Sequence, residues 1–145
     1  MTAYKLGVLG NPIEHSLSPK IHNIFAKHLS IDIEYQAYKV LPENLNNFIE
    51  NFFKSGGDGL NITMPHKINC LKSVDEVSET VRQTGAANTL TLDKKTNKIF
   101  ADSTDGKGFA EDLSEQTMAN LGGRLDNILI LGAGGAAQSI IPTLI

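Results

Sequence analysis

Apolar residues repeat along the chain with two spacings, one typical of strands and one typical of helices. Residues 4–9 form a short apolar run, and residues 31–37 alternate apolar with polar side chains, as half-buried strands do. After Ser18-Pro19 and again after Pro42, apolar residues recur three and four positions apart, so each segment is expected to be a helix. The helical apolar positions are Ile21, Ile24, Phe25 and Leu29 in the first segment and Leu45, Phe48, Ile49, Phe52 and Phe53 in the second.

The rest of the chain continues this alternation. Residues 60–63 predict a short strand, residues 66–84 short helical pieces, and residues 88–92 with 98–101 a hairpin around a polar tip. Strands that alternate with helices predict an α/β fold, namely a three-layer, mainly parallel open sheet with an antiparallel edge hairpin. One more helix is expected over residues 106–122.

A glycine motif follows this last helix. Residues 127–131 are a continuous apolar run, typical of a strand buried on both faces, and GAGGAA follows at 132–137. This is G-x-G-x-x-A between a strand and a helix, which predicts the start of a Rossmann-type dinucleotide-binding domain. An ordinary glycine-rich turn is the alternative. The cofactor-binding residues that the motif predicts are Gly132, Ala133, Gly134, Gly135 and Ala136.

These patterns predict a first α/β domain over residues 1–105, a connecting helix over 106–123 and the start of a dinucleotide-binding domain over 124–145. The chain ends soon after the last predicted helix begins, so the apolar run 128–131 lacks the neighbouring strands of a complete dinucleotide fold. Exposed apolar edges of this kind pair with other chains. We therefore expect self-association, for example as a homodimer, or disorder after about residue 123.

The composition mainly argues against certain partners and sites. Thirteen Lys and Arg against sixteen Asp and Glu give a net charge of -3 with the signs interleaved, which does not indicate a nucleic-acid or membrane partner. The single Cys70 cannot form an internal disulfide, and the four histidines lack the spacing of a zinc site, so no metal is expected. No segment is long and apolar enough for a signal peptide or a membrane span, and the expected location is the cytoplasm.

The loop GNPIEHSLSP at residues 10–19 places two serines beside the start of a helix. If Ser16 to Ser18 is extended, both hydroxyls fall on the same side of the chain. Together with the free N–H groups of the helix, they would form a site of the size of a carboxylate. The alternative is that Ser18 only caps the helix and Ser16 is an ordinary loop serine.

The segment NITMPHK at residues 61–67 repeats this logic at the end of a strand. Asn61 and Thr63 are expected to point away from the core at the carboxyl end of the strand, where open α/β sheets bind ligands. Lys67 is expected in the first helical turn after Pro65, where the helix dipole disfavours its ammonium form and suits it to acid–base chemistry. A surface lysine is the alternative.

Two further segments carry polar side chains at element ends. GAANT at 85–89 puts the Asn88 carboxamide at the beginning of a strand, and STDGKGF at 103–109 puts the Asp105 carboxylate just before a helix. Asp105 or Thr104 would also serve as a helix cap. With the glycine motif, these clusters indicate a site for a small polar anion that faces a nucleotide.

The motifs GNPIEHSLSP, NITMPHK, GAANT, STDGKGF and GAGGAA resemble those of shikimate dehydrogenases in order and approximate spacing, over the whole chain. The resemblance implies that the parent protein uses NADPH to reduce 3-dehydroshikimate reversibly to shikimate, in chorismate and aromatic amino-acid biosynthesis. It implies Lys67 and Asp105 as the catalytic residues. The substrate-binding residues that it implies are Ser16, Ser18, Asn61, Thr63, Lys67, Asn88 and Asp105.

In that chemistry, hydride delivery to a ketone leaves negative charge on oxygen, which the Lys67 ammonium would stabilise and protonate. The Asp105 carboxylate favours the ammonium form and so opposes the helix-dipole effect. Ser16 and Ser18 would hold the substrate carboxylate, and Asn61, Thr63, Asn88 and Asp105 the ring hydroxyls.

The chain also departs from the family. Ser103 stands where the family usually has Asn, and Ala101 where it has Gly. The remainder of the NADP fold, a substrate-contacting Gln and a final helix lie outside the 145 residues, so the chain itself is expected to be inactive. The alternatives are a quinate/shikimate dehydrogenase that prefers NAD, a non-catalytic polyol-carboxylate binding domain and a purely structural domain.

Overall fold

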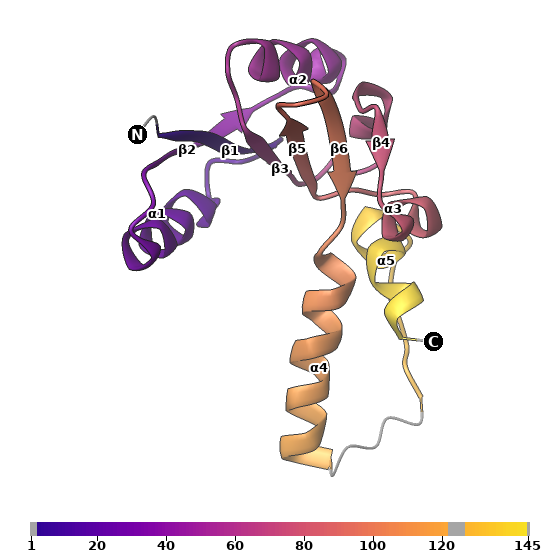
Figure 1. Cartoon of the computed structure of the whole chain (residues 1–145). Helices are drawn as coiled ribbons and strands as arrows, with labels where there is room; N and C mark the ends of the chain where they lie inside the picture. Colours follow the sequence, from indigo (N-terminus) through magenta and orange to yellow (C-terminus); the bar gives the residue numbers. More distant parts are fainter. Residues whose placement is uncertain (1–2, 122–126, 145) are drawn as a thin grey trace.

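The computed structural model describes residues 3–121 and 127–144, whose elements alternate between strands and helices (Figure 1). The strands are β1 (Tyr4–Gly10), β2 (Ile33–Lys39), β3 (Gly59–Ile62), β4 (Glu76–Val77), β5 (Thr89–Asp93) and β6 (Lys98–Asp102). The α-helices are α1 (Ser18–Leu29), α2 (Leu45–Lys54), α3 (Glu79–Thr84), α4 (Asp105–Leu121) and α5 (Gly135–Ile140). Short 3-10 helices are η1 (Pro42–Asn44), η2 (Asn69–Ser73) and η3 (Ile141–Thr143).

The six strands form one sheet in the order β2-β1-β3-β5-β6-β4. β1 pairs in parallel with β2 and with β3, whereas β5 is antiparallel to both β3 and β6. The α/β class, the parallel half and the hairpin are therefore confirmed. Strand β4, which pairs with β6 beyond the hairpin, was not predicted, because two residues are too few to show a period.

The face of the sheet that α2 covers holds the main core. Leu45, Ile49, Phe52 and Phe53 of this helix are buried, and they pack in one cluster with Leu9, Leu60, Ile62 and Leu90 of the sheet. Each such side chain contributes about 1.5–3 kcal/mol to folding when it is fully buried. The apolar period that predicted this helix is thus also what anchors it to the strands.

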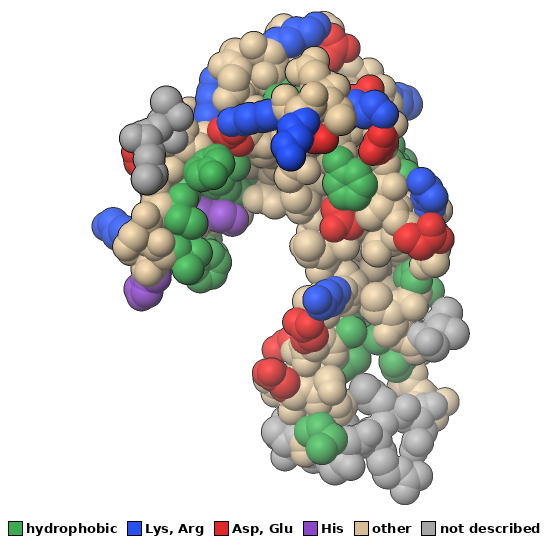
Figure 2. All heavy atoms as spheres, viewed as in Figure 1, with side chains coloured by type: hydrophobic (Ala, Val, Ile, Leu, Met, Phe, Trp, Pro, Cys, Tyr) green, Lys and Arg blue, Asp and Glu red, His purple; other side chains and the backbone are tan. Residues whose placement is uncertain are grey.

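Helix α1 lies on the opposite face, and its apolar side is largely uncovered (Figures 1 and 2). The predicted helical positions Ile21, Ile24, Phe25 and Leu29 are 42%, 46%, 57% and 67% exposed. The helix packs against β2 and β1 at the end of the sheet, and Ala26 is its one buried side chain. The helical period correctly predicted the helix, but a period does not specify what covers its apolar face.

Helix α4 projects away from the sheet, and α5 packs beside it and against α3 (Figure 1). Gly106 makes this contact possible, because a Cβ there would lie 2.4 Å from the carbonyl oxygen of Ser139. The predicted helices after Ser103 and after the glycine motif are therefore present. The predicted end of the connecting helix, at residues 122–123, lies outside the described residues.

The strand predicted at residues 127–131 is not formed. None of the described strands lies beside this segment, so its backbone has no ladder to join, and Leu129 and Leu131 are 84% and 89% exposed. The disorder expected after about residue 123 falls first on residues that lie outside the described part of the chain, and the structure places residues 127–144. In the described ranges, no helix has the length and apolar character needed to cross a bilayer.

The exposed leucines of residues 128–131 lead to a first prediction. We expect the chain to self-associate, because side chains of this size lose water contact when two copies meet. Leu129→Ser together with Leu131→Ser should weaken the association in sedimentation velocity measured over a concentration series. The control is Leu41→Ser, at a leucine that is 45% exposed and lies outside residues 128–131. This variant should leave the association unchanged. A wild-type chain that stays monomeric throughout the series would contradict the prediction.

Candidate functional site

Parallel pairing of β1 and β3 brings two of the sequence motifs together. Leu9 lies opposite Ile62 in the register, and beyond it the Thr63 N–H donates to the carbonyl oxygen of Leu9 at 3.0 Å. One step further, the Asn11 N–H donates to the Met64 carbonyl at 3.0 Å. The loop at residues 10–19 and the segment 61–67 therefore leave the same edge of the sheet side by side, as expected for carboxyl ends of parallel strands.

The two serines of the first loop line a pocket together with Thr63. Its volume is about 320 Å³, at the small end of the range for small-molecule sites. The condition of an extended segment from Ser16 to Ser18 is not met, because Leu17 has helical angles (φ -84°, ψ -6°) and the Ser18 N–H donates to Ser16 Oγ at 3.3 Å. Leu17, not Ser18, is the residue before the helix, and no side chain caps it, so the capping role considered for Ser18 is not what the structure has.

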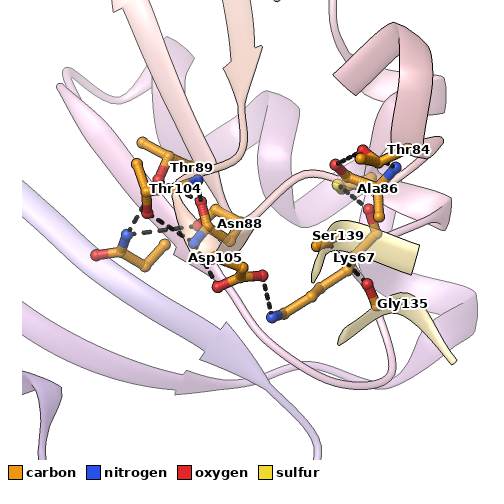
Figure 3. A network of polar contacts seen from close by, with 11 residues as sticks. Lys67, Thr84, Ala86, Asn88, Thr89, Thr104, Asp105, Gly135 and Ser139 are labelled. Atoms are coloured by element: carbon orange, nitrogen blue, oxygen red, sulfur yellow. Dashed lines mark hydrogen bonds and ion pairs between the residues drawn. The ribbon is translucent and has the colours of Figure 1, made fainter. Parts of the chain in front are cut away.

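Lys67, Asp105 and Asn88 form a connected polar group (Figure 3). Lys67 Nζ lies 2.6 Å from Asp105 Oδ2, and Asn88 Nδ2 donates to the other carboxylate oxygen, Oδ1, at 2.8 Å. The side chains of Lys67 and Asp105 are 17% and 24% exposed, so the ion pair is mostly shielded yet open to a ligand. Residues from a turn, the start of a strand and the start of a helix thus meet at one point.

Hydrogen bonds from the backbone hold this group in place. The Lys67 carbonyl accepts from the Ala87 N–H at 2.8 Å and from Cys70 Sγ at 3.3 Å. Burial raises the pKa of the Cys70 thiol to about 12, so the thiol keeps the proton that it donates. Asn88 is held by Thr104, whose N–H donates to Asn88 Oδ1 at 3.1 Å and whose Oγ1 accepts from Asn88 Nδ2 at 2.9 Å.

Lys67 does not begin a helix, and that prediction was wrong. The residue sits in a turn, and the nearest helical element is η2, which starts at Asn69. The turn is fixed at His66, whose N–H donates to the Thr63 carbonyl at 2.9 Å and whose buried Nε2 lies 2.7 Å from the Val40 carbonyl. The nearest charge that acts on the Lys67 ammonium is therefore the Asp105 carboxylate and not a helix dipole.

The glycine loop reaches this group at one end. A Cβ added to Gly135 would lie 3.3 Å from Lys67 Cβ, and Gly135 and Ala136 line a pocket with Lys67 and Thr63. Gly132, Ala133 and Gly134 are not among the residues that line this pocket. Of the five predicted cofactor residues, two therefore adjoin the polar group of the first domain.

Asn61 and Thr63 lie as the strand period predicted, since the alternate residues Leu60 and Ile62 are buried at 1% and 2% exposure. Asn61 Oδ1 accepts a hydrogen bond at 2.7 Å from the hydroxyl of Tyr35, which lies in the strand predicted at residues 31–37 and was not among the predicted site residues. The sequence did offer one indication of this role: Tyr35 is a tyrosine in a half-buried strand, and a buried tyrosine hydroxyl usually has a polar partner.

The arrangement combines hydroxyl donors at one end with an ammonium–carboxylate pair at the other. The serine end suits a carboxylate, and the Lys67–Asp105 pair can orient a hydroxyl and move a proton to or from it. Within residues 3–121 and 127–144, no group of three or more His, Cys, Asp and Glu side chains is arranged to hold a metal ion.

Comparison with known proteins gives a consistent result. Residues 8–90 match the family described as the shikimate dehydrogenase substrate binding domain. The NADP(+)-dependent shikimate dehydrogenase of Colwellia psychrerythraea is 42% identical over 95% of this chain and 48% of its own length. A shikimate dehydrogenase solved with NADP+ superposes with a TM-score of 0.88 at 37% identity, over 98% of this chain and 48% of that one. The Thermus thermophilus enzyme solved with NADP(H) and shikimate has a TM-score of 0.84 at 31% identity, over 97% and 51%.

Tyr35 gives a pH prediction. Burial raises its pKa to about 12, whereas a hydrogen bond with the Ser18 side chain lowers the pKa. The folded chain disfavours the phenolate, so the protonated Tyr35 phenol contributes fully to the stability of the fold below about pH 10, the pKa of an unfolded tyrosine. This contribution is lost as the pH rises toward about 12. Urea unfolding should therefore show a smaller loss of stability between pH 9 and pH 11 in Tyr35→Phe than in the wild type. Equal losses would contradict the prediction.

Proposed function

The chain belongs to the shikimate dehydrogenase family, and we propose that it supplies the substrate-binding half of an NADP-dependent enzyme that interconverts 3-dehydroshikimate and shikimate. The observation that carries the proposal is the shielded Lys67–Asp105 pair, at 2.6 Å, beside Asn88. Thr63 lines both the pocket of Lys67 and the pocket of the two serines. The chain spans about half the length of the curated relatives that it matches, so the activity is proposed for the whole protein.

The substrate carboxylate would lie in the pocket at Ser16 and Ser18. Both side chains line it, and the Ser18 hydroxyl is not used to cap α1. Charge-assisted hydrogen bonds to a carboxylate are about twice as strong as neutral ones, so this end would contribute much of the affinity. The ring hydroxyls would then lie toward Asn61, Thr63, Asn88 and Asp105, at the ends of β3, β5 and β6.

The reaction needs a proton at the atom where negative charge develops. Reduction forms a C–H bond at the carbonyl carbon, and the electron pair of the C=O π bond moves to oxygen. Lys67 Nζ donates its proton to that oxygen, and the resulting amine regains a proton from water. Asp105 holds the ammonium in position through its Oδ2, while Asn88 fixes the carboxylate through Oδ1. In the reverse direction the Lys67 amine removes the proton from the hydroxyl.

The residues around Lys67 fit a nicotinamide cofactor in one respect. Gly135 lies so near Lys67 that a Cβ there would press on the aliphatic part of the Lys67 side chain, at 3.3 Å from its Cβ. When bound, NADPH supplies the hydride. Gly132 to Ala136 would hold its pyrophosphate, as the glycine motif indicates.

Binding of shikimate tests the proposal directly. Asp105→Asn removes the charge that faces Lys67, and hydrogen bonds to charged groups contribute about 1.5–3 kcal/mol, so shikimate affinity should fall about tenfold or more. Isothermal titration calorimetry would measure this fall. The control is Asp112→Asn, the same chemical change at an exposed residue of the same helix, which should leave the affinity unchanged. Equal affinities for the wild type and Asp105→Asn would contradict the proposal, and tighter binding of quinate than of shikimate would reassign the substrate.

The chain by itself is expected to bind shikimate without oxidising it. Residues 127–131 join no strand of the sheet, so the glycine loop lacks the support of a buried strand on its amino-terminal side. Absorbance at 340 nm, with shikimate and NADP+ both present, should therefore stay constant. A steady rise that depends on both compounds and is abolished by Lys67→Met would show that the described loop suffices for cofactor binding.

A further inference from the structure

Tyr35 connects the two ends of the candidate site. It is 7% exposed on β2, and its hydroxyl donates to Asn61 Oδ1 on β3 at 2.7 Å. On the other side of the ring, His22 of α1 stacks on it with ring centroids 4.1 Å apart and planes 15° apart. His22 also contacts the first turn of α1, because its Nδ1 lies 2.9 Å from the Ser18 carbonyl oxygen.

The partners of Asn61 determine which way its amide faces. Asn61 Nδ2 lies 3.4 Å from the Asn88 carbonyl oxygen and 3.5 Å from Thr89 Oγ1. A carbonyl oxygen only accepts hydrogen bonds, so the amide nitrogen must face Asn88, and the amide oxygen must face Tyr35. The phenol therefore donates, which is the direction in which a buried, protonated tyrosine stays satisfied.

This orientation determines what Asn61 offers to a ligand. Its oxygen is occupied at 2.7 Å by Tyr35, whereas its nitrogen makes only long contacts of 3.4 and 3.5 Å, which a closer ligand oxygen would replace. Asn61 and Tyr35 line the same pocket, with Thr89 and His22. Asn61 Nδ2 is thus the group of this amide that a ligand can engage by replacing a long contact, and the ligand atom that meets this nitrogen must accept.

We propose that Tyr35 is a positioning residue of the substrate site: it holds the amide of Asn61 so that Nδ2 faces the ligand, and through His22 it joins this amide to the turn that carries Ser18. The inference rests on the proposed function for the identity of the ligand, shikimate. The geometry of the Tyr35–Asn61 pair does not depend on that function. Without the hydroxyl, Asn61 loses the partner of its oxygen, and the amide is free to rotate and present either group.

The experiment compares Tyr35→Phe with Tyr38→Phe in the 145-residue chain. Tyr38 is on the same strand and packs with Phe48 and Phe52 in the core on the other face, so its variant removes a phenol hydroxyl away from Asn61. Two quantities are measured: the ¹³Cγ resonance of Asn61 without ligand, and the affinity for shikimate. We expect Tyr35→Phe to move the resonance and to weaken shikimate binding about three- to tenfold, the equivalent of one neutral hydrogen bond. Tyr38→Phe should do neither.

Two results would overturn the inference. One is an Asn61 resonance that Tyr35→Phe leaves unchanged, and the other is a moved resonance with unchanged shikimate affinity. If affinity does fall, a double-variant cycle tests the route, because Tyr35→Phe should cost no further affinity in an Asn61→Ala background if it acts through Asn61. Additive losses would show that Tyr35 acts on affinity independently of Asn61 and would overturn the positioning role.

The inference stays testable if Tyr35→Phe does not fold or if the wild-type chain does not bind shikimate. If Tyr35→Phe does not fold, the Tyr35 ¹³Cζ resonance in Asn61→Ala takes its place: a shift supports the pair, and no shift overturns it. If the wild-type chain does not bind shikimate, the proposed function of this site fails. The ligand-free resonances still decide whether Tyr35 holds Asn61, so the two failures are distinguishable.

Discussion

The parallel pairing of β1 with β3 is the constraint on which the site depends. The register that sets Leu9 opposite Ile62 makes both strands end at the same edge, and the hydrogen bonds of Thr63 and Asn11 continue the pairing into the two loops. The antiparallel β5 then begins beside the end of β3, because Asn61 lies opposite Thr89. The loop serines, the turn that carries Lys67 and the amide of Asn88 converge only because these three strands keep that register. A slip of one residue would turn Asn61 and Thr63 toward the core.

The Lys67–Asp105 pair illustrates a difference between stabilising a fold and performing chemistry. Shielding two charges costs solvation that a single ion pair barely offsets, so the pair is a weak source of stability. The structure nevertheless surrounds it with bonds whose main effect is to fix its position: Asn88 on the carboxylate, and Ala87 and Cys70 on the backbone of Lys67. Such support is what a group that must meet a substrate atom requires.

Much of the site could be predicted from the sequence because its residues occupy positions with a local signal. Asn61 and Thr63 alternate with buried Leu60 and Ile62, and Asp105 stands where a helix begins, so local periodicity was sufficient. The rest depends on residues distant in the chain. Tyr35 and Asn61 are 26 residues apart, and the turn at Lys67 depends on a contact between His66 and Val40 across another 26.

The segments that were predicted wrongly, or only in part, show the same limit. The apolar run at 127–131 has the composition of a buried strand, but a strand forms only where another strand supplies its hydrogen bonds. The apolar face of α1 was predicted as a helix face, yet Phe25 and Leu29 are exposed. Figure 2 shows hydrophobic side chains over α1 beside the hollow between this helix and α4. The extended form considered for residues 16–18 is absent, since Leu17 has helical angles and the Ser18 N–H donates to Ser16 Oγ.

The position of the shikimate site is tested most directly by mapping backbone amide shifts in the ¹⁵N-labelled chain as shikimate is added. We predict shifts that cluster at the loop 10–19, at residues 61–67 and around Asn88 and Asp105, with α2 and the hairpin tip unaffected. Shifts confined to the opposite pocket, which Lys54, Lys72 and Asp75 line between α2 and the hairpin, would contradict it. So would a spectrum that does not change at all.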